Sequence, residues 1–158
     1  MANSSCVSEY KNKIINELIN NNTFLQVLNV TESEIENGLV YRRIYPYLYI
    51  NNTQTVSETY ICIEVNINST SRNNVYSYPQ ITIDIVSHQD DMKLNLAGIS
   101  ATKIDYLGEL IDEIFNGKSG YGIGNLELKL NKAGSLNDTY RYRELIFKSV
   151  DINDSVCD

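Results

Sequence analysis

The single histidine of the chain stands in a segment that could bind a metal ion. His88 is followed by Asp90 and Asp91, and an imidazole with two carboxylates can ligate a divalent ion or begin a proton relay. No second histidine joins them, and no Gly-x-Ser-x-Gly sequence supplies a serine nucleophile. We therefore expect His88 to lie in a solvated polar loop, and we predict no metal site.

A glycine-rich segment could in principle bind phosphate. Gly117-Lys118-Ser119 resembles the end of a phosphate-binding loop, but that motif needs a glycine five residues before Gly117, where Asp112 stands. The segment also follows a predicted helix rather than a strand. The alternate glycines up to Gly124 miss the dinucleotide pattern in the same way, because no strand precedes them and no helix follows. We predict a flexible connection and no cofactor.

Three residues provide the most serious enzymatic alternative, a metal-dependent nuclease. Glu127 and Lys129 form a Glu-x-Lys pair on one side of a predicted strand, and Asp112 could supply a further carboxylate. Such a site places carboxylates on Mg²⁺ and a lysine near the attacking water. Against it, Asp112 lies on a helix face, and the Glu-x-Lys side is typical of a wet strand face. We predict no catalytic residue.

Tyrosine and arginine are concentrated in a way that is typical of interfaces. The chain has 12 Tyr and no Trp, and five tyrosines between positions 41 and 60 are interleaved with Arg42 and Arg43. The alternatives are that tyrosines merely cover a sheet face, or stack on single-stranded nucleic acid, which so acidic a chain disfavours. The predicted interface residues are Arg43, Tyr45, Tyr47, Tyr49, Arg72, Tyr76 and Tyr78.

These side chains must be positioned by a small set of elements. The predicted helices cover residues 8–20 and 101–116, and the predicted strands cover residues 60–68, 80–87, 125–131 and 139–150, the last of them bulged. Residues 41–50 alternate but contain Pro46, which predicts an edge strand or an extended arm. Residues 23–40 are ambiguous, although Thr31 and Glu34 fit a capping box. Long polar loops are expected at 69–79 and 88–99, and a turn at 133–138.

This order predicts an α+β fold, a mainly antiparallel sheet with helices packed on one face, plus an extended arm and long hairpin loops. We expect it to be a single domain over residues 1–158. The apolar stripe of the second helix should pack on alternate isoleucines of the first two strands; the residues are Ile104, Leu107, Ile111 and Phe115 against Ile61, Ile63, Ile81 and Ile83.

Charge and composition exclude several classes of function. The chain has 158 residues and a formal net charge of −7, which argues against wrapping a duplex or adsorbing to an anionic membrane. It does not exclude surrounding DNA without gripping it. No apolar run is long enough to cross a membrane and no signal peptide begins the sequence, so we expect synthesis in the cytoplasm. Cys6, Cys62 and Cys157 should then be reduced structural thiols.

The order of elements, rather than any motif, resembles a known family. The elements that carry the resemblance are the helix with Ile14 and Leu18, the arm Arg43-Ile-Tyr-Pro-Tyr-Leu-Tyr-Ile50, the paired strands, the acidic-faced helix and the terminal strand that ends at Val150. Together they resemble the neck and tail-completion proteins of tailed bacteriophages, in particular the tail terminators. The resemblance spans nearly the whole chain.

The resemblance implies a structural virion protein of the phage neck with no catalytic site. Such a protein forms a ring, typically a hexamer, between the tail tube protein and the head-closure or connector proteins, and genomic DNA passes through without specific binding. The arm and the two long loops could supply the heterologous contacts that a ring requires. The alternatives are another head–tail connector component, such as a head-closure or adaptor protein, and the small nuclease.

Overall fold

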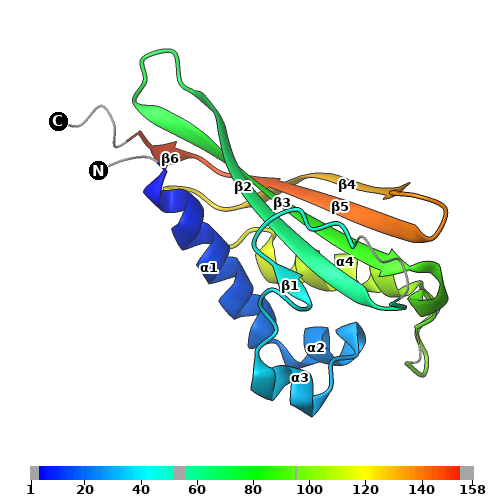
Figure 1. Ribbon diagram of the computed structural model, residues 1–158. Helices are drawn as coiled ribbons and strands as arrows, with labels where there is room; N and C mark the ends of the chain where they lie inside the picture. Colours follow the sequence, from blue (N-terminus) through cyan, green and yellow to red (C-terminus); the bar gives the residue numbers. More distant parts are fainter. Residues whose placement is uncertain (1–3, 52–55, 95, 154–158) are drawn as a thin grey trace.

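The computed structural model describes residues 4–51, 56–94 and 96–153. Its elements in chain order are α1 (Ser5–Ile19), α2 (Asn22–Leu28), α3 (Glu32–Asn37), β1 (Ile44–Tyr45), β2 (Thr59–Thr70), β3 (Tyr76–His88), the 3₁₀ helix η1 (Gln89–Asp91), α4 (Lys103–Phe115), β4 (Glu127–Ser135), β5 (Tyr140–Lys148) and β6 (Asp151–Ile152) (Figure 1).

The strands form one sheet in the order β1-β2-β3-β5-β4, and β6 pairs with the first residues of β3. Among the described strands, β1 runs parallel to β2 and the other neighbouring pairs are antiparallel. Helices α1, α2 and α4 contribute buried side chains to a single core with the sheet. The predicted α+β class is therefore confirmed. We call the sheet surface opposite that core the open face.

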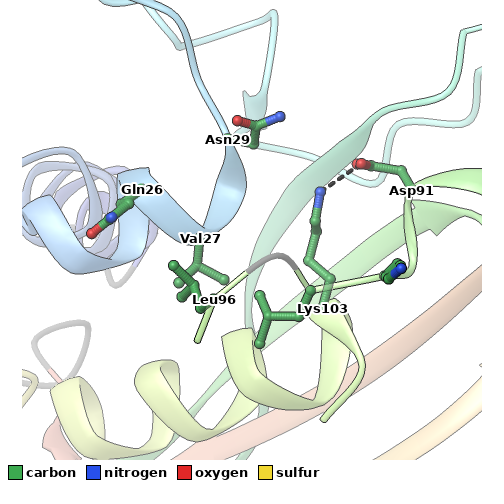
Figure 2. A pocket seen from close by; sticks show the side chains of 8 residues that line it. Gln26, Val27, Asn29, Asp91, Leu96 and Lys103 are labelled. Carbon is green, nitrogen blue, oxygen red and sulfur yellow. Dashed lines mark hydrogen bonds and ion pairs between the residues drawn. The ribbon is translucent and has the colours of Figure 1, made fainter. Parts of the chain in front are cut away.

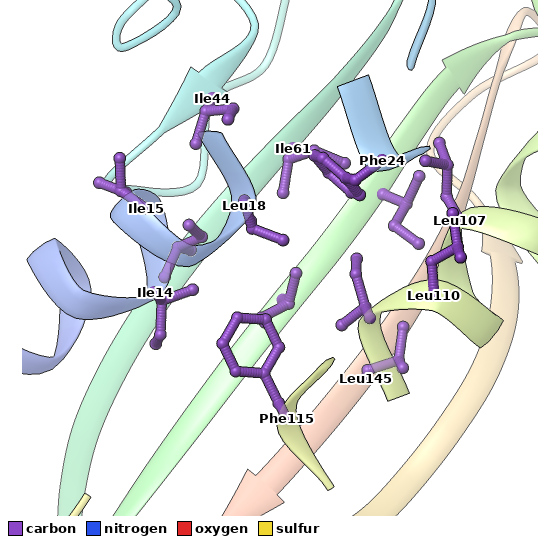
Figure 3. Close-up of a cluster of buried hydrophobic side chains, with 14 of the residues drawn as sticks. Ile14, Ile15, Leu18, Phe24, Ile44, Ile61, Leu107, Leu110, Phe115 and Leu145 are labelled. Carbon is purple, nitrogen blue, oxygen red and sulfur yellow. The ribbon is translucent and has the colours of Figure 1, made fainter. Parts of the chain in front are cut away.

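The main core lies between the helices and alternate residues of the central strands (Figure 3). Ile61 and Ile63 of β2 face it, and Leu145 of β5 joins them, because every second side chain of a strand points to the same face. The predicted packing of α4 on the sheet is confirmed. The fully or nearly fully buried residues involved are Ile104, Leu107, Ile111, Phe115, Ile81 and Ile83.

The helices begin and end close to the predicted positions. Helix α1 starts at Ser5, three residues earlier than predicted, and ends at Ile19. The ambiguous segment 23–40 contains two short helices, and the predicted capping box is present, with Thr31 and Glu34 exchanging side-chain and backbone bonds. Helix α4 begins later than position 101, because the Thr102 hydroxyl accepts the backbone N–H of Asp105 at 3.3 Å and caps it.

The predicted long loop at 69–79 is wrong. Strands β2 and β3 continue to Thr70 and from Tyr76, so a five-residue turn over positions 71–75 joins them. The polar sequence hid this extension, because that end of the hairpin has little apolar burial. It is held instead by backbone pairing with β6. Pro79 is tolerated in β3 because the β2–β3 register shifts just beyond it, between Ile67 and Thr70.

The last hairpin also differs from its predicted bounds. Strand β4 starts at Glu127 and runs to Ser135, through much of the predicted turn, while the predicted strand 139–150 ends at Lys148 and is followed by the separate strand β6. The bulge lies in β4, between Leu128 and Leu130, and not in the last strand. The apolar residues of β5 do not keep to alternate positions, because apolar and aromatic side chains lie on both faces of this strand.

Candidate assembly interface

The predicted arm is mostly not a strand. Only Ile44 and Tyr45 pair with β2. The turn before them is closed by the N–H groups of Arg43 and Ile44, which both donate to the Leu39 carbonyl, at 2.9 and 3.0 Å. Pro46 follows and cannot donate to a ladder, so the chain leaves the sheet edge there. We keep the name arm for residues 41–50.

Arg43 is predicted as an interface residue, but the residue is only 5% exposed. Its guanidinium donates to the carbonyls of Leu28 and Thr59 at 2.7 and 2.9 Å, and to a Glu34 carboxylate oxygen at 2.7 Å. Burial opposes ionisation of Glu34, but the bonds from Thr31 and Arg43 outweigh it and lower the pKa of that carboxyl. Arg43 therefore ties α2, α3 and β2 together within the chain.

The arm folds over the open face and covers a second apolar cluster. Tyr45 is buried there and stacks on Tyr49, with ring centroids 4.0 Å apart, and both rings meet Tyr60 edge to face. The Tyr60 hydroxyl donates to the Tyr49 carbonyl at 3.3 Å. Burial raises the pKa of Tyr45 to about 12. At this end of the sheet, therefore, the tyrosines cover the sheet face, which is the alternative to an interface that the sequence left open.

The outer surface of the arm carries exposed apolar side chains. Tyr47, Leu48 and Ile50 are 42%, 54% and 55% exposed, and Tyr41 is more exposed still. Consecutive exposed apolar residues on a fixed segment are typical of a surface that another protein covers. Of the predicted arm residues, Tyr47 is the one that remains exposed.

A groove of about 300 Å³ lies on the open face beside the arm. Leu48 and Leu136, the latter in the β4–β5 turn, line its sides, and Tyr142 and Val86 supply further apolar surface. Gly134 lies opposite Tyr142, and a side-chain carbon there would come within 2.5 Å of the Tyr142 ring. The glycine thus lets the Tyr142 ring pack directly against the β4 backbone.

Two carboxylates lie in the same groove. Asp84 of β3 and Glu144 of β5 are direct cross-strand partners. Like charges in that relation destabilise a sheet. Burial and then the Glu144 charge raise the pKa of Asp84 to about 6. Within the described part of the chain no Lys or Arg forms an ion pair with either carboxylate.

The far end of the β2–β3 hairpin carries the other predicted interface residues. Tyr76 and Tyr78 are exposed at alternate positions of β3, with Val75 beside them. Arg72 is exposed in the turn. The turn is firmly held, because the Ser71 hydroxyl accepts the Tyr76 N–H at 3.0 Å, and the Ser71 N–H donates to the Tyr76 carbonyl at 2.8 Å. Figure 1 shows this hairpin projecting past the rest of the sheet.

The histidine segment is not the solvated loop that we expect from the sequence. His88 ends β3, is buried, and meets the Tyr140 ring edge to face at 5.2 Å. Asp91 accepts bonds from Lys103 at 2.5 Å and from the Thr59 hydroxyl at 2.7 Å. Figure 2 shows this ion pair at a hollow beside α2. The polar groups of the segment therefore hold the end of β3 to α4.

The nuclease candidates occupy ordinary structural positions. The exposed Glu127 forms an ion pair with Lys129, and Asp112 is on α4. Across the residues that the structure describes, no three His, Cys, Asp or Glu side chains are gathered as a metal ion would require. Lys118 of the glycine-rich connection pairs with Glu17 at 2.6 Å.

The cysteines can be placed only in part. Cys6 is partly buried on α1, Cys62 is buried on β2, and Cys157 lies outside the described residues. Burial raises the pKa of the Cys62 thiol to about 12, so it is not a nucleophile near neutrality.

The groove residues Asp84, Leu136, Tyr142 and Glu144 were missed as candidates. The sequence shows Asp84 opposite the isoleucines of its strand, which places it on the open face. Its cross-strand relation to Glu144 depends on the β3–β5 register, which no local pattern reveals.

Comparisons with known proteins give a family and a fold. The family model described as YomW matches residues 12–149. A chain of the solved structure described as "Virion of native gene transfer agent (GTA) particle" matches with a TM-score of 0.57 and 12% identity, over 88% of this chain and 91% of that chain. No curated protein matches. In the part of the chain that the structure describes, none of the helices combines the length and apolar character of a membrane span.

Proposed function

The chain belongs to the YomW family, and we propose that it is a structural virion protein that forms a ring at the phage neck. In this proposal the ring ends the tail tube and joins it to the head-closure or connector proteins. The observation that carries the proposal is the shared fold with a chain of a virion particle, over nearly the full length of both chains.

The distribution of exposed apolar surface supports a ring. The arm and the tip of the β2–β3 hairpin carry exposed aromatic and aliphatic side chains at separate places on the sheet. Different surfaces that meet head to tail generate closed rings when the rotation between subunits closes. The interface then includes Tyr47 of the arm and Arg72, Tyr76 and Tyr78 of the hairpin. Arg43, Tyr45 and Tyr49 support it from within the subunit.

The charge of the chain supports passage of DNA without binding. Each subunit carries a formal net charge of −7. A ring multiplies that charge, and acidic side chains that face the lumen would repel the phosphate backbone. The protein would then be a non-enzymatic component of the virion, with DNA as cargo rather than as ligand.

The test is a phage, or the prophage of a bacterial host, in which this gene is deleted. The proposal predicts filled heads and separate tails that fail to join, with joining restored by the gene in trans. A ring that ends the tail also predicts tails of irregular length, whereas a head-closure or adaptor role predicts tails of normal length and heads that lose DNA. Normal joined particles would contradict the proposal.

A further inference from the structure

Two surfaces of this chain are complementary to each other but lie too far apart to meet within one copy. We propose that the β2–β3 hairpin tip of one copy docks in the open-face groove of the next copy, where its Arg72 guanidinium bridges the Asp84 and Glu144 carboxylates. The inference rests on the proposed ring and names the contact that would close it.

The hairpin tip has the features of a rigid insertion element. Exposed Val75 is the last residue of the turn that contains Arg72, and exposed Tyr76 begins β3. The C-terminal segment braces the tip, because the Asn153 backbone N–H donates to the Val75 carbonyl at 2.8 Å and its side-chain amide to the Asn74 carbonyl at 2.7 Å. A braced tip loses little conformational entropy when it binds.

Arg72 is the positively charged side chain of the hairpin tip. Among the described residues no carboxylate lies within ion-pair distance of it. A planar guanidinium can bond two carboxylates at once, and it packs well against an aromatic ring such as that of Tyr142 in the groove.

The groove is complementary to this tip in both apolar surface and charge. Its apolar sides, Leu48 and Leu136, suit Val75 and Tyr76, and its two adjacent carboxylates suit one arginine. Lys132 of β4 is the register partner of Glu144, but it is exposed and makes no ion pair among the described residues. The carboxylates are therefore available to a cation from outside the chain.

The positions of tip and groove require a second copy. Tyr76 and Asp84 are both on β3, and eight residues at a strand rise of about 3.4 Å separate them by about 27 Å. Figure 1 shows the hairpin tip and the β4–β5 turn at opposite ends of the sheet. A tip that binds the far end of an identical neighbour makes a head-to-tail contact, which is the kind that closes into a ring.

The test uses charge reversal on the two surfaces and sedimentation of the full chain over a concentration range. Arg72→Glu alone and Asp84→Lys alone should each weaken self-association by more than about tenfold, because each places like charges together. An equimolar mixture of the two variants should regain association, because each tip then meets a groove of opposite charge. Glu144→Lys serves as a second groove variant if Asp84→Lys does not fold.

The matched control is Lys93→Glu. It reverses the charge of an exposed lysine in the loop before α4 and should leave association unchanged. The proposal is overturned if the wild type does not associate at millimolar concentration, if either reversal leaves association intact, or if the mixture fails to recover. Particles that contain the protein and join normally with Arg72→Glu would overturn this contact and leave the proposed function standing. Absence of the protein from particles would overturn the function itself.

Discussion

Arg43 shows how a residue chosen for its type can serve the fold instead of an interface. Its three bonds link two helix ends to β2, and removal of the side chain would leave two carbonyls and the Glu34 carboxylate without those donors. Losing one partner of a buried charged network typically costs several kcal/mol.

We therefore expect Arg43→Ala to lower the free energy of unfolding by about 3 kcal/mol, measured by urea denaturation. Arg43→Lys should recover only part of the loss, because an ammonium cannot reproduce the three-way geometry. The neighbouring exposed Arg42 is the matched control, and Arg42→Ala should change stability by less than about 0.5 kcal/mol. Equal effects of the two alanine variants would contradict the buried network.

The ionised form of Asp84 destabilises the folded chain, so its effect on the free energy of unfolding depends on pH. Its pKa is about 6 in the folded chain, raised by burial and by Glu144, so the folded state binds this proton more tightly than the unfolded state. Stability therefore falls as pH rises from about 4 to 6, and the full cost of the charged form is present above that range.

Asp84→Asn should accordingly stabilise the isolated subunit near pH 8 by about 2–3 kcal/mol, since a pKa difference of about two corresponds to that energy. The gain should nearly vanish near pH 3.5, where Asp84 is mostly protonated in both states. Thermal unfolding at the two pH values measures it. Asp138→Asn, at an exposed position of the β4–β5 turn, is the matched control for the loss of one negative charge.

At the scale of elements, α4 is the helix whose packing the sequence predicts best. Ile111 is fully buried among isoleucines of the sheet. Ile111→Ala should cost about 2–5 kcal/mol by cavity formation, read from the midpoint of urea unfolding. Glu113→Ala on the exposed side of the same helix should be nearly neutral. A tolerated Ile111→Asp would refute the placement of this helix on the sheet.

The sequence predicts an element well where burial leaves an apolar pattern, and poorly where turn bonds or strand register hold the chain. Ile61 and Ile83 alternate with polar residues, so their strands are clear from the sequence. The hairpin beyond Ile67 is held by turn bonds and by β6, and neither leaves an apolar pattern, so Tyr76 and Tyr78 read as loop residues. The groove is harder still, because the pairing of Asp84 with Glu144 is a property of register.

At the scale of the whole molecule, the exposed arm should matter for assembly and little for folding. Changing Tyr47, Leu48 and Ile50 together to Ser removes apolar surface that is largely exposed in the subunit. We expect a small change in thermal stability and a marked loss of joined particles in a complementation assay. Ile35→Ser, at an exposed apolar position on α3, is the control and should complement fully. Full complementation by the triple variant would show that the arm is not a joint.

The most direct measurement of the central claim is the position of this chain in purified particles, seen by electron microscopy with gold-labelled antibodies raised against it. A ring protein of the neck predicts label confined to the junction of head and tail on intact particles, and at one end of free tails. Label spread over the head, label at the distal tail tip, or particles without label would contradict the assignment.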